Sequence, residues 1–120
     1  MLIIDLKNCN EFISGDGCKL LECLHPDKQN IKLRYSLAHA TLKPGDKSKP
    51  HKLKTSEVYY ILEGKGLMHI DDESAGVGKD QALYIPPNST QHIKNTGSTD
   101  LKFLCVVDPA WRPEDEEILE

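Results

Sequence analysis

The stretch PGDKSKPHKLKTSEVYYILEG, residues Pro44 to Gly64, contains the pattern that decides the fold. It opens with a Pro-Gly turn signal and closes with a run of β-branched and aromatic residues that is typical of a strand. Residues two apart on a strand face the same side, so His51 and Leu53 should project into one interior. Glu57 follows in the next segment. The stretch therefore predicts two strands that direct a histidine and a carboxylate toward a shared cavity.

Strand signals continue on both sides of this stretch. Short runs rich in β-branched and aromatic residues alternate with Gly, Pro and polar clusters, which indicates an all-β sandwich or barrel. Thr96–Asp100 is predicted to be a hairpin turn. The acidic tail Pro113–Glu120 is predicted to be a short helix, because proline and carboxylates suit a first helical turn. The predicted strands lie within Ile31–Leu42, Ser56–Gly64, Leu67–Asp72, Gln81–Pro87, Gln91–Asn95 and Leu101–Asp108.

The composition is that of an ordinary soluble globular protein, with 38% hydrophobic and 28% charged residues. A chain of 120 residues predicts a single domain, residues 1–120. No apolar run approaches the roughly 20 residues that cross a bilayer, and the N-terminal residues lack the features of a signal peptide. The formal net charge of −4 disfavours nucleic-acid binding. We therefore expect a cytoplasmic protein with neither a nucleic-acid nor a membrane partner.

The four cysteines show no CxxC spacing, so a zinc cluster is the weaker interpretation. A disulfide among the first three is a second alternative, which a reducing compartment disfavours. The simplest interpretation is that all four are small buried hydrophobic residues. They are Cys9, Cys18, Cys23 and Cys105.

Residues 45–64 resemble the first motif of the cupin family, which runs G-x5-H-x-H-x3-E-x6-G. Gly45, His51, Glu57 and Gly64 stand at the family's positions. Leu53 stands where the family has its second histidine, and leucine cannot ligate a metal. This first motif therefore supports the fold more strongly than it supports an activity.

Residues 78–95, GKDQALYIPPNSTQHIKN, resemble the second cupin motif. Pro86 fits its proline and Asn95 fits its closing asparagine. Counting four residues back from Asn95, or five forward from Pro86, places Gln91 rather than His92 at the family's histidine position. A one-residue slip turns a strand side chain to the other face, so His92 would reach the cavity only through a local bulge.

The resemblance implies a cupin double-stranded β-helix, a jelly-roll barrel, in which four side chains hold one divalent metal ion. The corresponding ligands here are His51, Glu57 and Gln91, with His92 as the alternative ligand. Imidazole, carboxylate and amide oxygen are acceptable ligands for Zn, Mn, Fe, Ni or Co. The alternative is a metal-free cavity in which the three side chains hydrogen-bond to one another. Strand parity and the motif give Leu53, Tyr59, Ser36, Ala38 and Ala40 as the expected cavity-lining residues.

Two classes of function follow from these residues. In the first, the barrel binds a divalent metal, a small metabolite or both, and could be a metal-dependent enzyme of unknown substrate. The alternative is a metal-free binding or regulatory cupin without catalysis. The fold alone does not choose between them.

A homodimer is also expected. Leu33, Tyr35 and Leu37 alternate with small residues, so the strand Ile31–Leu42 has no fully polar face. A second subunit would cover the exposed apolar face, and His39, which faces away from the cavity, would lie near the seam. Tyr84 is expected in the core.

Overall fold

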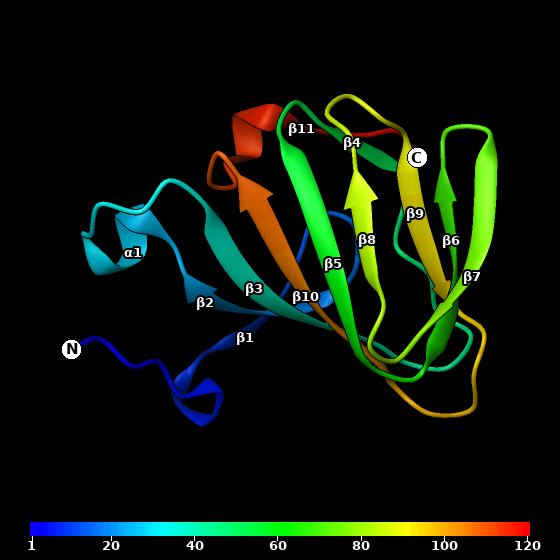
Figure 1. Cartoon of the computed structure of the whole chain (residues 1–120), viewed down its shortest axis with the longest axis horizontal. Helices are drawn as coiled ribbons and strands as arrows, with labels where there is room; N and C mark the ends of the chain where they lie inside the picture. Colours follow the sequence, from blue (N-terminus) through cyan, green and yellow to red (C-terminus); the bar gives the residue numbers. More distant parts are fainter.

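The computed structural model describes all of residues 1–120 as two antiparallel sheets packed face to face in a jelly roll (Figure 1). A 3-10 turn, η1 (Leu6–Asn8), precedes the sheets, and a one-turn helix, α1 (Pro26–Gln29), follows the second strand. The six-stranded sheet has the order β1 (Glu11–Ile13), β2 (Lys19–Leu24), β3 (Ser36–Leu42), β10 (Leu101–Asp108), β5 (Ser56–Glu63) and β8 (Ala82–Ile85). The five-stranded sheet has the order β11 (Glu116–Ile118), β4 (His51–Leu53), β9 (Gln91–Asn95), β6 (Lys65–Ile70) and β7 (Glu73–Gly78).

From β3 to β11 the chain changes sheet at every connection except the β6–β7 hairpin. This crossing confirms the jelly-roll expectation. The prediction of a hairpin at Thr96–Asp100 is wrong, because β9 pairs with β6 and β4 whereas β10 pairs with β3 and β5. Those five residues carry the chain from one sheet to the other. Ile70 pairs with Glu73, so the acidic residues Asp71 and Asp72 form the two-residue hairpin loop.

The acidic tail is not an α-helix. It forms one 3-10 turn, η2 (Pro113–Asp115), and then strand β11, which pairs with β4 through Glu116↔Leu53 and Ile118↔His51. Pairing with β4 satisfies backbone groups that a helix would have left unpaired at that sheet edge. The tail thereby reaches the strand that carries His51.

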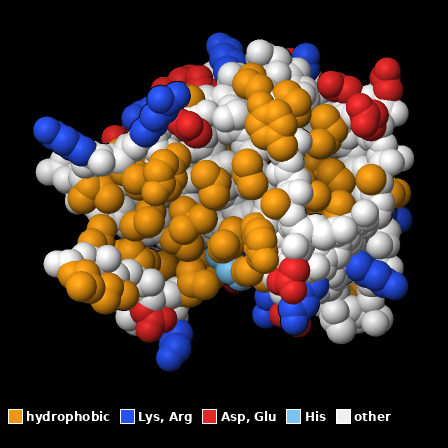
Figure 2. All heavy atoms as spheres, viewed as in Figure 1, with side chains coloured by type: hydrophobic (Ala, Val, Ile, Leu, Met, Phe, Trp, Pro, Cys, Tyr) orange, Lys and Arg blue, Asp and Glu red, His pale blue; other side chains and the backbone are white.

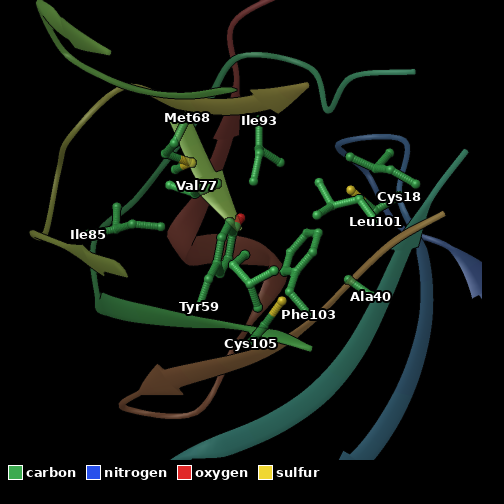
Figure 3. Packing of buried hydrophobic residues seen from close by; sticks show 12 residues of the cluster. Cys18, Ala40, Tyr59, Met68, Val77, Ile85, Ile93, Leu101, Phe103 and Cys105 are labelled. Carbon is green, nitrogen blue, oxygen red and sulfur yellow. The ribbon is translucent and has the colours of Figure 1, made fainter. Parts of the chain in front are cut away.

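The hydrophobic core lies between the two sheets (Figure 3). Every second residue of β10, from Leu101 through Phe103 and Cys105 to Val107, is buried, as a half-buried strand requires. Tyr59 and Phe103 lie side by side, with ring centroids 4.6 Å apart and a tilted orientation that suits aromatic pairs. The core therefore fixes the inward faces of β5 and β10, from which the site is built.

The outer face of the six-stranded sheet is apolar rather than polar. Figure 2 shows hydrophobic side chains spread over much of the molecule on this side. Tyr60 and Tyr84 are 40% and 62% exposed, so the expectation that Tyr84 belongs to the core is wrong. Tyr84 lies opposite Val58 in the β5–β8 pair, on the face away from the core.

The N-terminal segment extends away from the barrel (Figure 1). Its large apolar side chains are exposed, and the last two of them belong to the edge strand β1. No helix in the chain is long and apolar enough to cross a membrane. The exposed apolar residues of the segment are Met1, Leu2, Ile3, Leu6, Phe12 and Ile13.

Gly64, the last residue of the first motif, marks a point where the backbone allows no side chain. Its φ is +84°, and a Cβ there would lie 2.6 Å from the carbonyl oxygen of Asp100. Gly64→Ala should therefore lower the free energy of unfolding by more than about 1 kcal/mol, measured by urea denaturation. Gly76→Ala is the control, because a Cβ at Gly76 meets nothing within 4 Å. Equal stability of the two variants would contradict the close approach of Gly64 to the backbone of Asp100.

Candidate functional site

A cavity of about 270 Å³ opens between the sheets at the end of the barrel that carries the N-terminal hairpin. It is lined by 20 residues, 12 of them hydrophobic, from β1, β2, β3, β4, β5, β10 and β11 and from the loops beside them. A cavity that is mostly apolar with a few polar groups is the usual form of a small-molecule site. The polar and charged lining residues are Ser14, Asp16, Glu22, Ser36, His51, Glu57 and Glu116.

Glu57 is a buried carboxyl group that lines the cavity. Its residue is 6% exposed, and Oε1 accepts a hydrogen bond from Nε2 of Gln91 at 3.0 Å. The pKa of Glu57 is raised to about 8. Burial is the largest cause; the Gln91 hydrogen bond opposes the rise, and the nearby carboxylates of Asp16 and Glu116 add to it. Glu57 is therefore a neutral acid at pH 7. Its second oxygen, Oε2, has no hydrogen-bond partner in the protein.

Gln91 is held in place from both ends of its amide. Its Oε1 accepts a hydrogen bond from the Tyr59 hydroxyl at 3.0 Å, while its Nε2 donates to Glu57. Gln91 is 1% exposed and belongs to β9, whereas Tyr59 and Glu57 belong to β5. This chain of bonds joins the two sheets through the interior and fixes the orientation of the Glu57 carboxyl group.

His51 presents one ring nitrogen to the cavity. Its Nδ1 lies 2.7 Å from the carbonyl oxygen of Lys49, which can only accept, so Nδ1 carries the proton and donates. In the neutral ring Nε2 then holds the lone pair, and it lies 3.6 Å from Oδ2 of Asp16. That distance is longer than a hydrogen bond. His51 and Glu57 together give the cavity a proton acceptor and a protonated acid, which is the equipment for moving a proton on a bound molecule.

Asp16 was missed by the sequence analysis. It lies in the turn between β1 and β2, where its Oδ1 accepts hydrogen bonds from the Ser14 hydroxyl and, at 3.1 Å, from the Cys18 backbone N–H. The SGDG segment, Ser14–Gly17, is a turn signal that could have located it on a loop, but not against His51. Asp16 and His51 are far apart in the sequence, so a local turn signal cannot predict that they lie close together.

Glu116 and Trp111 were missed as well. The indole Nε1–H of Trp111 donates to Oε2 of Glu116 at 3.2 Å, and both residues line the cavity. Ser36 accepts the backbone N–H of Trp111 at 2.9 Å, which ties this segment to β3. The prediction of a helical tail concealed Glu116, because only strand pairing with β4 brings it to the cavity.

The other predicted residues fall into three groups. Ser36, Ala38, Ala40 and Tyr59 line the cavity. Leu53 is buried on the same strand as His51 but is not among the lining residues. Two histidines lie outside the cavity. His92 stacks on His69 across β9 and β6, with ring centroids 4.2 Å apart. His39 lies on the outer face of β3, opposite Leu104 of β10.

The residues at the motif positions do not fit a tightly held metal ion as they are arranged. Both ends of the Gln91 amide are engaged by Tyr59 and Glu57, and Leu53 has no donor atom. No group of three or more His, Cys, Asp or Glu side chains is placed to hold a metal ion. The set His51, Glu57 and Gln91 stays a prediction as far as metal binding is concerned.

Comparison with known proteins matches residues 38–107 to the family model of the cupin domain. An uncharacterized protein of Methanocaldococcus jannaschii is 44% identical over 110 residues, which cover 91% of this chain and 87% of that protein. The oxalate-binding protein of Thermotoga maritima is 34% identical over 71 residues, which cover 58% of this chain and 59% of that protein. The polyketide cyclase RemF of Streptomyces resistomycificus superposes with a TM-score of 0.83 at 17% identity, covering 100% of this chain and 86% of that chain. At that identity the likeness shows the fold alone.

The pH dependence of stability tests the protonation state of Glu57. Its pKa of about 8 in the folded protein lies above its ordinary value of 4.5, so over this interval the folded protein keeps a proton that the unfolded chain has released. The stabilisation is complete below the ordinary pKa of 4.5. It falls by up to about 1.4 kcal/mol per pH unit as the pH rises, and is lost as the pH passes through the folded pKa of about 8. Glu57→Gln keeps an acceptor for Gln91 but cannot titrate, so its stability should fall less from about pH 5 to pH 8. Urea unfolding curves that give parallel pH profiles for the two proteins would contradict the assignment.

Proposed function

This chain belongs to the cupin domain family, and we propose that it binds a small organic molecule in the barrel cavity through its own side chains, without a resident metal ion. The observation that carries the proposal is a mostly apolar cavity with a few polar side chains in its lining. There, Oε2 of Glu57 and Nε2 of His51 both lack a hydrogen-bond partner. Neither atom is sealed within the protein, so both are available from the cavity to pair with a bound molecule.

The family relationship supports this class of function. The name of the Thermotoga relative refers to the binding of oxalate, and that of the Streptomyces structure refers to the cyclisation of a polyketide. Both are small organic molecules. They support a small-molecule site in this chain without choosing its ligand, because the same barrel serves different chemistries.

A metal-dependent enzyme is the weaker interpretation of the same residues. A metal would need the Gln91 amide oxygen, which already accepts the Tyr59 hydroxyl, and a negatively charged Glu57, whose raised pKa keeps it neutral at pH 7. A bound ion would lower that pKa and would therefore have to supply the cost of ionising a buried acid. Elemental analysis of the purified protein after supply of Zn, Mn, Fe, Ni and Co should accordingly give well under one ion per chain.

The binding experiment uses Trp111, the only tryptophan of the chain and a lining residue of the cavity, as its reporter. Cyclohexylmethanol is a suitable probe because it is apolar, carries one hydroxyl and does not absorb where tryptophan does. We expect a saturable change in Trp111 fluorescence, with the same dissociation constant before and after dialysis against a chelator. Loss of binding on chelation, restored by a metal, would contradict the proposal.

The matched variants separate the cavity from the surface. Ala38→Phe fills the cavity from β3 and should weaken binding of the probe by more than about tenfold. Ala82→Phe places the same side chain at an exposed position of the edge strand β8 and should leave binding unchanged. Equal effects of the two substitutions would show that the probe does not bind in the cavity.

We also propose that the protein is a homodimer, in which a second copy covers the outer face of the six-stranded sheet. That face exposes Tyr60 and Tyr84, and the N-terminal segment of the same chain exposes Ile3, Phe12 and Ile13. In a dimer with a two-fold axis, the N-terminal segment of each copy can pack on the outer sheet face of the other, so that both apolar surfaces are covered. Apolar surface of this extent is unusual on a monomer.

Multi-angle light scattering tests the dimer directly. At micromolar concentration the mass should be about twice 13.5 kDa. Tyr60→Lys places a charge on the covered face and should shift the protein toward the monomer, whereas Glu73→Lys, on the exposed start of β7, should not. A wild-type mass near that of one chain would refute the proposal.

A further inference from the structure

The charged groups around the cavity are almost all of one sign. Four carboxyl side chains line it, together with one histidine, and no lysine or arginine is among the 20 lining residues. The whole chain has 15 lysines and arginines against 19 aspartates and glutamates. Basic side chains are thus abundant in the protein but are kept out of the cavity. The four carboxyl residues are Asp16, Glu22, Glu57 and Glu116.

These carboxylates act on the interior of the cavity and not only on the solvent around it. Asp16 is 9% exposed, and Glu116 is held toward the cavity by the indole of Trp111. Both of them raise the pKa of Glu57, as negative charges close to a buried acid do. The potential inside the cavity is therefore negative, and a low-dielectric wall strengthens it.

An unpaired nitrogen of a buried histidine points to a ligand in this negative space. His51 is 2% exposed, and its Nε2 makes no hydrogen bond, because the Asp16 carboxylate 3.6 Å away is itself only an acceptor. A lone pair that faces a carboxylate across a gap is matched by a group that donates hydrogen bonds to both. An ammonium group has three N–H donors and a positive charge. It can therefore donate to the His51 nitrogen and balance the charge of the Asp16 carboxylate at the same time.

An anionic ligand such as a carboxylate has no hydrogen to donate to His51 and has the same sign of charge as Asp16. A dicarboxylate such as oxalate, which gives the Thermotoga relative its name, would need arginine, lysine or backbone N–H groups to balance its charge. This cavity offers it Asp16, Glu22 and Glu116 instead. The ligand of this chain should therefore differ in charge from that of the oxalate-binding relative.

The remaining walls suit the apolar part of such a ligand. Phe12, Tyr59, Phe103 and Trp111 all line the cavity, beside aliphatic and small side chains of β2 and β3. Aromatic faces attract cations as well as apolar groups. A cavity of about 270 Å³ has room for a compact amine with a ring or a short branched chain.

We infer that the cavity binds an organic cation, a primary amine or a similar nitrogen base on a compact apolar body, between Asp16, His51 and Glu116. This inference rests on the proposed function, because it names the chemical class of ligand for the same cavity. Asp16 and Glu116 supply the countercharge, and Nε2 of His51 accepts one of the ammonium hydrogens.

Three probes of one shape and different charge test the inference: cyclohexylmethylamine, cyclohexylmethanol and cyclohexanecarboxylate. Trp111 fluorescence titrations at pH 7 should rank the amine first and the carboxylate last, with dissociation constants at least about tenfold apart. Glu116→Gln keeps an acceptor for the Trp111 indole and should reduce the preference for the amine over the alcohol several-fold. Glu117→Gln is the matched control, because Glu117 is exposed on the other face of β11 and should leave the preference unchanged.

The outcomes separate this inference from the proposed function. Carboxylate binding as tight as or tighter than amine binding would overturn the inference and leave a small-molecule site in place. Failure of all three probes to bind would overturn both. An amine preference that survives Glu116→Gln and Asp16→Asn in folded protein, as judged by circular dichroism, would also overturn the inference, because the charge would then have another source.

Discussion

The Gln91 amide is the interaction on which the rest of the site depends. It lies between the two sheets and is bonded at both ends, to the Tyr59 hydroxyl and to the Glu57 carboxyl group, each at 3.0 Å. Hydrogen bonds in a buried network reinforce one another, and a network with every member paired also fixes a single arrangement of the core. Because this amide occupies Oε1 of Glu57, the other oxygen of the acid is the one left for the cavity.

The departures from the family motif form a consistent set around that amide. Where the motif implies a second histidine the chain has Leu53, and where it implies a third it has Gln91. Burial keeps the acid protonated, and a neutral amide is a suitable partner for it. The remaining free charge around the cavity belongs to Asp16 and Glu116, which lie outside both motifs.

The sequence predicted the barrel and the inward residues of the two motifs because strand side chains alternate with a period of two. The positions of the two cupin motifs, together with strand parity, placed His51, Glu57 and Gln91 on inner faces and His92 outside the cavity. Counting could not place Asp16 or Glu116, since each reaches the cavity only when a distant strand or turn packs against β4 or β5. The same limit explains two errors: turn residues at Thr96–Asp100 do not tell which sheet receives the next strand, and an acidic tail does not reveal that β4 has a free edge.

The protonation state of Glu57 is the central claim, and carbon-13 NMR of glutamate-labelled protein measures it most directly. Comparison with Glu57→Gln assigns the Glu57 carboxyl signal, which can then be followed through a pH titration. The account predicts that this signal changes from the protonated to the ionised position at about pH 8. A transition near 4.5, the ordinary value for the side chain, would show that Glu57 is charged at neutral pH and would contradict the account.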